Sequence, residues 1–173
     1  RESGVSSLEF SAANGKQKNG LTWLWVAALG LILDQVTKLA VMSHLVPYQD
    51  VIPVTGFFNL VHVHNTGAAF SLLADQPGWQ RSVFLAIGVG ASVLILCRLR
   101  QTRGRALFAV ALSLILGGAV GNIIDRVLYG HVIDFLNFHV AGWHWPAFNV
   151  ADSGITVGAV LLVLDSLRKP DKA

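Results

Sequence analysis

Three aspartates in the second half of the chain have the spacing and the neighbours expected of a carboxylate site. Asp125 lies in "GNIIDR", Asp134 in "HVIDF" and Asp152 in "FNVADSGI", with Asn122 and Asn149 beside them. Two carboxylates that share a site cannot both ionise easily, so one keeps a proton and the other stays charged. Such a pair can activate water against an amide carbonyl and then protonate the leaving amine. Spacing alone leaves all three aspartates as candidates.

The composition indicates where such a site would lie. Of the 173 residues, 53% are hydrophobic and only 13% are charged, and the mean hydropathy is +0.56. A soluble domain carries roughly a quarter charged residues, so the chain has the composition of a membrane protein. The single cysteine, Cys97, excludes an internal disulfide and a multi-cysteine metal site, and we expect it to be a packing residue.

Four apolar stretches are long enough to cross a bilayer, which takes about 20 residues. The prediction is an all-α integral membrane protein with one membrane domain over residues 21–168, and the first stretch is too long for a signal-peptide core, so we expect it to be retained. Residues 1–20 are polar and predict a disordered tail or residues left by cloning, and residues 169–173 predict a cytoplasmic tail. The expected helices are about 21–42, 79–99, 106–128 and 149–168.

Lysine and arginine near the helix ends predict the orientation, because these residues stay on the cytoplasmic side. They fall in three clusters that alternate with the helices and place both termini in the cytoplasm. The links 43–78 and 129–148 then face the opposite side, which is the periplasm in a bacterium. The clusters are Lys16 and Lys18, then Arg98, Arg100, Arg103 and Arg105, then Arg168, Lys169 and Lys172.

The two outer links carry further signals. In the first, β-branched and aromatic residues nearly alternate, which predicts short strands at about 50–54 and 57–63. Open strands are not viable in hydrocarbon, so we expect a small sheet on the membrane surface. In the second link, Asp134 is expected to be extended just past a helix end. Trp143 and Trp145 predict either an aromatic belt at the headgroups or a substrate contact.

Ionisable residues inside membrane helices cost about 2.5 to 3.5 kcal/mol each on insertion scales, so each needs a reason. Asp34 and Lys38 are four apart on one helical face and predict a neutralising pair. Arg126 can pair with Asp125, which would keep that carboxylate ionised and structural. Asp152 falls in a first helical turn, where the helix dipole favours a negative charge and a capping role is also plausible.

Other functions fit part of the pattern. His62 and His64 alternate on an expected strand and could bind zinc together with His131, His139 or His144, although no HExxH motif is present. The same carboxylates could form the proton relay of a small carrier or channel. A structural partner in membrane assembly is a third possibility. Gly117 and Gly121, four apart, predict close packing of the helix around 106–128.

Several motifs together resemble one known family. "LDQVTK", "NTGAAFS", "GNIIDR", "HVIDF" and "FNVADSGI" occur in the order found in the lipoprotein signal peptidases (signal peptidase II) of bacteria. The resemblance covers about residues 21–168. His64 stands where a tyrosine is expected before Asn65, which weakens the case for His64 as a contact.

The resemblance implies an aspartic endopeptidase of the bacterial inner membrane with its active site toward the periplasm and a small β-cradle. Its substrates would be diacylglyceryl-modified prolipoproteins, cut on the amino side of the lipidated cysteine, and it needs no metal or other cofactor and no nucleic acid. A cyclic peptide inhibitor of the globomycin type is expected to bind. By resemblance the catalytic pair is Asp134 and Asp152, supported by Asp34, Lys38, Asn65, Asn122, Asp125, Arg126 and Asn149.

Overall fold

Four long helices and one small sheet make up the described part of the chain, residues 19–67 and 79–167 of this computed structural model. The 3-10 helix η1 (Gly20–Trp23) leads into the first long helix. The long helices are α1 (Leu24–His44), α2 (Trp79–Gln101), α3 (Ala106–Leu128) and α4 (Val150–Leu167). The strands are β1 (Val51–Thr55), β2 (Phe58–Asn65), β3 (Val132–Val140) and β4 (Trp143–His144). The predicted tails at 1–20 and 169–173 lie almost wholly outside the described residues. The first and last basic clusters, Lys16 with Lys18 and Arg168 with Lys169 and Lys172, lie outside them as well.

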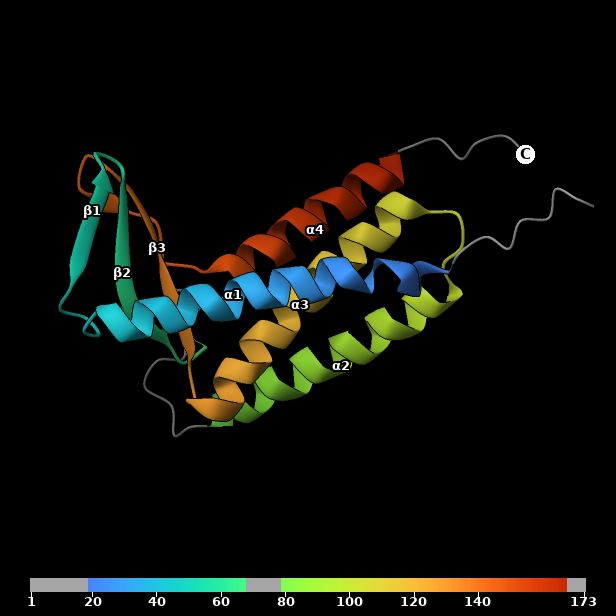
Figure 1. Ribbon diagram of the computed structural model, residues 1–173, viewed down its shortest axis with the longest axis horizontal. Coiled ribbons are helices and arrows are strands. Elements are labelled where there is room, and N and C mark those ends of the chain that lie inside the picture. Colours follow the sequence, from blue (N-terminus) through green and yellow to red (C-terminus); the bar gives the residue numbers. More distant parts are fainter. Residues whose placement is uncertain (1–18, 68–78, 168–173) are drawn as a thin grey trace, which may run out of the picture.

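All four long helices are long and apolar enough to cross a membrane. This finding confirms the predicted fold class of four membrane helices with a small sheet. Figure 1 shows the helices running along the long axis of the molecule, with the sheet at one end. The opposite end holds the start of α1 and the short link between α2 and α3.

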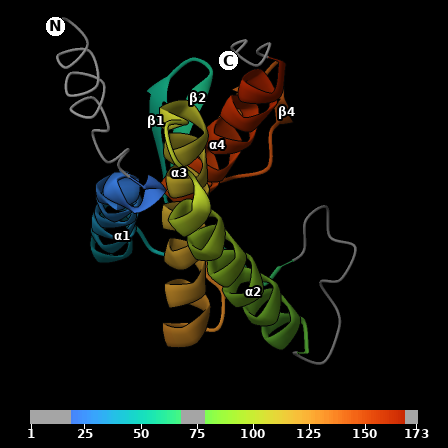
Figure 2. The same cartoon turned by 90° about the vertical axis from the view of Figure 1, so that its right-hand side faces the viewer.

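Helix α3 is the centre of the bundle. It contacts α1, α2 and α4 and is the most buried of the four helices. Figure 2 shows α1 and α4 on different sides of α3, with α2 crossing it obliquely. The other helices direct much of their apolar surface outward, as expected of helices in contact with lipid.

The sheet has the strand order β1-β2-β3-β4, with antiparallel neighbours throughout. The two strands expected in the first outer link are β1 and β2, but the sequence prediction was incomplete. Strands β3 and β4 come from the second outer link, and β3 pairs with β2 so that Val63 lies opposite Asp134. The pairing of β3 with β2 is favourable because β2 would otherwise present a row of unpaired backbone groups at a sheet edge.

A small hydrophobic cluster joins the sheet to the bundle. Ile133 and Phe135 of β3 pack against Val41 near the end of α1 and against Leu45 just after it. All four side chains are buried. The first residues of β3 are therefore held at the mouth of the helix bundle.

Glycines on α3 let its neighbours approach closely, as the spacing of Gly117 and Gly121 predicted. A Cβ on Gly117 would lie 2.6 Å from the carbonyl oxygen of Ala27 on α1. A Cβ on Gly118 would overlap the carbonyl oxygen of Ala151 on α4. The backbones of α1 and α4 thus reach α3 at positions where no other residue leaves room.

Gly118→Ala is expected to destabilise the protein by about 1–3 kcal/mol, because the added methyl group overpacks the contact between α3 and α4. Unfolding in detergent, followed by circular dichroism, measures the loss. The matched control is Gly90→Ala on α2, where a Cβ meets nothing within 4 Å and alanine favours the helix. Equal midpoints for the two variants would contradict the close packing of α3 on α4.

Candidate functional site

Asp134 lies near the start of β3 and is almost completely buried. Two asparagine amides donate to its carboxylate, one to each oxygen. Asn149 Nδ2 lies 2.8 Å from Asp134 Oδ1, and Asn65 Nδ2 lies 3.0 Å from Asp134 Oδ2. Asn65 is the last residue of β2, so pairing between β2 and β3 brings the amide to the carboxylate.

Asp152 lies in the first turn of α4, as the sequence predicted. Asn122 on α3 donates its Nδ2 to Asp152 Oδ1 over 2.8 Å. The side chain that caps the helix is that of Asn149, whose Oδ1 accepts the Asp152 backbone N–H at 2.9 Å. Asp152 is therefore not the cap, and its carboxylate is left for other contacts.

Two asparagines connect the two aspartates. Asn149 donates to Asp134 and accepts from the backbone of Asp152. Its Nδ2 also lies 3.4 Å from Asn122 Oδ1, and Asn122 in turn donates to the Asp152 carboxylate. The structure thus brings Asp134 and Asp152, which lie on different elements, into one hydrogen-bonded network.

A buried ion cluster lies beside this network. Lys38 Nζ is 2.8 Å from Asp34 Oδ2 and 2.7 Å from Asp125 Oδ2, and it donates to Asn122 Oδ1 over 3.2 Å. Lys38, Asp34 and Asp125 each have at most 1% of their surface exposed. Because the cluster has no contact with water, the charges depend on one another for stabilisation.

The ion cluster confirms one pairing and corrects another. Asp34 and Lys38 form the expected pair across one helical turn. Asp125, however, pairs with Lys38 of α1 and not with Arg126, its neighbour in sequence. Arg126 instead donates its Nη1 to the Asn122 carbonyl oxygen, and its guanidinium lies over the ring of Phe84. Residues 125 and 126 point to different sides of α3 because neighbours on a helix do not share a face.

Each carboxylate of the ion cluster also accepts a hydrogen bond from the backbone next to one of the two aspartates, Asp134 or Asp152. Asp125 Oδ2 accepts the N–H of Ile133, which precedes Asp134. Asp34 Oδ1 accepts the N–H of Ala151, which precedes Asp152, at 2.9 Å. The ion cluster therefore positions β3 and α4 at the points where the two aspartates stand.

Sequence reasoning missed Gln35 and assigned Gly121 only to packing. Gln35 Nε2 donates to Asp125 Oδ1 at 3.1 Å and to Asp34 Oδ2 at 3.2 Å. A Cβ on Gly121 would lie 2.5 Å from Asp34 Oδ2, so the glycine makes room for that carboxylate. The signals for Gln35 were its polarity within an apolar helix and its place in the motif "LDQVTK".

The environment of Asp134 favours its protonated form. Its pKa is raised to about 7, first because burial removes water from the carboxylate and second because Asp152 is negative. Hydrogen bonds from Asn65 and Asn149 and the charge of Lys38 oppose this rise. At neutral pH the site can therefore offer one carboxylic acid for proton donation.

The described histidines are not arranged as the alternative zinc site would require. His64 stacks on His131 with ring centroids 3.8 Å apart, and His62 lies beside His64. His62 Nδ1 is engaged by the carbonyl oxygen of Leu45. Burial lowers the pKa of His64 and His131. Within residues 19–67 and 79–167, no group of three or more potential ligands is arranged to hold a metal ion.

Trp143 and Trp145 stand at the far end of the sheet from Asp134. With Phe138 and Phe148 they line an apolar cavity of about 320 Å³. Both tryptophans are more than half exposed. An exposed aromatic surface at a sheet that borders membrane helices fits the expected position near lipid headgroups.

Known proteins similar to this chain were found at both the sequence and the structure level. A family model described as signal peptidase (SPase) II matches residues 26–168. The lipoprotein signal peptidase of Janthinobacterium sp. (strain Marseille) is 56% identical over 152 residues, covering 88% of this chain and 92% of the relative. That of Ralstonia nicotianae is 51% identical over 169 residues, covering 98% and 96%. A solved bacterial membrane enzyme matches with a TM-score of 0.76 at 31% identity, covering 86% and 94%.

Lys38→Met is expected to destabilise the protein by about 3–5 kcal/mol, because Asp34 and Asp125 would remain buried without their cation. Chemical unfolding in detergent measures the change. The triple variant Asp34→Asn, Lys38→Met, Asp125→Asn removes all three charges and should recover part of the loss. A single Lys38→Met variant as stable as wild type would show that the cluster does not support the fold.

The carboxylic acid band of Asp134 in the infrared spectrum, identified by comparison with Asp134→Asn, is expected to disappear as the pH rises through about 7. Below that pH the folded protein holds the proton, and above it the carboxylate forms. Asn65→Ala removes a donor that favours the carboxylate, so the titration should move to higher pH. Disappearance of the band in the range of an ordinary aspartate would contradict the assigned environment.

Proposed function

This chain belongs to the signal peptidase II family, and on that premise we propose that Asp134 and Asp152 are the catalytic pair of a peptidase that removes signal peptides from prolipoproteins. The observation that carries this proposal is the shared network of Asn122 and Asn149 between the two carboxylates. Asp134 is buried and Asp152 is partly buried, and they stand where the helix bundle meets the sheet.

The two aspartates have different roles in the proposed reaction. Asp152 lies at the positive end of α4, which favours its negative form, so it takes a proton from water. The water oxygen adds to the scissile carbonyl carbon while Asp134 gives its proton to the carbonyl oxygen. The C–N bond then breaks as Asp152 passes its proton to the leaving nitrogen and one hydroxyl group of the intermediate returns its proton to Asp134. The two carboxyl groups together end with the one proton they began with.

Arg126 is a candidate contact for the substrate. Its side chain is partly buried above the ring of Phe84, and Nε is buried without a hydrogen-bond partner among the described residues. A buried donor in that state suits a ligand carbonyl. We assign to Asp34, Lys38, Asp125 and the asparagines the positioning of the aspartates, as their contacts support.

The substrate we propose is a diacylglyceryl-modified prolipoprotein, cut on the amino side of the lipidated cysteine. Acyl chains held in the bilayer fix the height of the scissile bond relative to the helix ends. Such anchoring supplies part of the positioning that catalysis needs. The sheet at the same end of the bundle offers a rigid border for an extended peptide (Figure 1).

The proposed location is the bacterial inner membrane, with the site toward the periplasm. The last turn of α2 and the link to α3 hold Arg98, Arg100, Arg103 and Arg105, whereas the site lies at the other end of the bundle. Positively charged links remain in the cytoplasm. The charge distribution therefore supports a periplasmic site.

Asp134→Asn and Asp152→Asn are each expected to lower cleavage of a lipidated prolipoprotein by about 10²- to 10⁴-fold, the range of a lost acid or base. A gel-shift assay in detergent measures the conversion. Asp165→Asn, at the other end of α4, is the matched control and should cleave normally. Asp125→Asn should lose less activity than Asp134→Asn at equal folding, because Asp125 contacts the cation and the backbone.

Near-normal cleavage by a folded Asp134→Asn or Asp152→Asn variant would remove that residue from the catalytic pair. Loss of wild-type activity on adding a chelator would redirect attention to the histidines. A cyclic peptide of the globomycin type is expected to inhibit the wild type, since it would occupy the same site. Cleavage that continues unchanged in its saturating presence would count against the proposed substrate site.

A further inference from the structure

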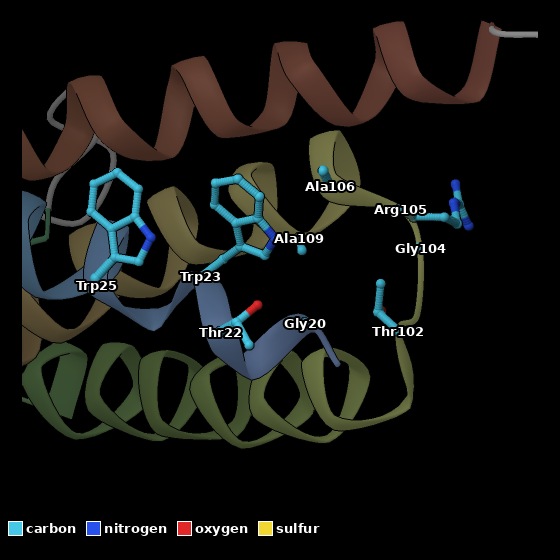
Figure 3. Close-up of a pocket in the computed structure, with 9 residues that line it drawn as sticks. All are labelled: Gly20, Thr22, Trp23, Trp25, Thr102, Gly104, Arg105, Ala106 and Ala109. Carbon is cyan, nitrogen blue, oxygen red and sulfur yellow. The ribbon is translucent and has the colours of Figure 1, made fainter. Parts of the chain in front are cut away.

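A second cavity lies at the end of the bundle opposite the aspartates. Its volume is about 410 Å³, and its walls come from η1, the first turn of α1, the link between α2 and α3, and the start of α3. Figure 3 shows Trp23 and Trp25 projecting to the same side of the η1–α1 segment, with Arg105 at the outer end. The peptidase reaction proposed above makes no use of this cavity.

Backbone contacts hold the cavity walls together. Gly20 donates its N–H to the Thr102 carbonyl oxygen over 2.8 Å, and Asn19 and Arg103 form an isolated β-bridge. A Cβ on Gly20 would lie 2.7 Å from the Leu99 carbonyl oxygen, so the segment before α1 is pressed against the end of α2. These contacts fix the backbone of the cavity walls.

The side chains of the cavity are suited to an acceptor-rich anion. Trp23, Trp25 and Arg105 carry donors and no acceptors. None of the nine lining residues in the described part of the chain is acidic. The guanidinium of Arg105 lies over Phe108 and pairs with Asp165, yet its side chain is 58% exposed and has five N–H donors in all.

The surroundings specify a lipid and not a free ion. Exposed apolar side chains, among them Trp25, Leu29, Leu33 and Val36, continue from the cavity along one side of α1. Their spacing of about four residues places them on one face of the helix. The same end of the bundle has arginines at 98, 100, 103 and 105, and basic residues near a membrane surface attract anionic lipids.

We propose that this cavity binds the phosphodiester headgroup of an anionic glycerophospholipid from the cytoplasmic leaflet, whose acyl chains lie along the exposed face of α1. Arg105, at the outer end of the cavity, binds the phosphate oxygens, and Trp23 and Trp25 border the glycerol region. The leaflet rests on the proposed orientation of the helices, and the site itself does not depend on the peptidase chemistry.

Native mass spectrometry of the full-length protein, released from detergent with phosphatidylglycerol or phosphatidylcholine, tests the proposal. The wild type should retain phosphatidylglycerol in preference. Ala106→Leu fills the cavity from an exposed position without changing a charge, and Arg105→Gln removes the phosphate partner. Arg105→Gln should lower retention about fivefold or more, since one arginine near an anionic lipid contributes about 1 kcal/mol. Ala106→Leu should lower retention because the larger side chain takes up space inside the cavity.

Two control variants distinguish lipid binding in the cavity from attraction by the general positive charge at this end of the bundle. Arg100→Gln removes the same charge from the last turn of α2, but Arg100 does not line the cavity, so retention should fall clearly less than in Arg105→Gln. Asp165→Asn releases the guanidinium of Arg105 and should raise retention. Asp134→Asn should bind lipid normally, so failure of the catalytic pair and failure of the lipid site give different results.

Three outcomes would overturn the proposal. Equal losses in Arg100→Gln and Arg105→Gln would reduce the effect to general charge attraction. Unchanged retention in a folded Ala106→Leu variant would place the lipid elsewhere. Displacement of phosphatidylglycerol by an equal concentration of inorganic phosphate would indicate an ion site without a role for the acyl chains.

Discussion

Lys38 brings one positive charge into a part of the bundle that is closed to water, where Asp34 and Asp125 meet it. Burial of either carboxylate without a cation would be costly. Each carboxylate also contacts the backbone next to Asp134 or Asp152. Asp125 holds the N–H of Ile133, and Asp34 holds the N–H of Ala151. One buried cation thus determines the position of the strand and of the helix that carry the two aspartates.

The polar interior depends in turn on the small residues of α3. Gly117 and Gly118 let the backbones of α1 and α4 approach, and Gly121 leaves space for the Asp34 carboxylate. In a membrane the apolar side chains gain little by leaving lipid, so close backbone contact and buried polar contacts must supply the cohesion. The close helix contacts and the buried polar cluster therefore both depend on the glycines of α3.

Local sequence rules predicted the features that depend on near neighbours. Four apolar stretches predicted the helices, and a separation of four residues predicted the contact between Asp34 and Lys38. The same rules favoured Arg126 as the partner of Asp125, whereas the structure pairs Asp125 with Lys38 of another helix. Gln35 and the pairing of β3 with β2 were missed for a related reason, because their partners lie far away in sequence and appear only when the chain folds.

The order of synthesis gives the pair of Asp34 and Lys38 a further consequence. Helix α1 emerges from the ribosome and enters the bilayer first, long before Asp125, Asn122 and Ala151 exist to contact it. Because the two charges stand one helical turn apart and neutralise each other, α1 can insert without an unpaired charge. The Asp34 carboxylate, which later accepts the N–H of Ala151, is therefore carried into the membrane 117 residues ahead of the backbone that it will hold. The enzyme is assembled only when its last helix arrives.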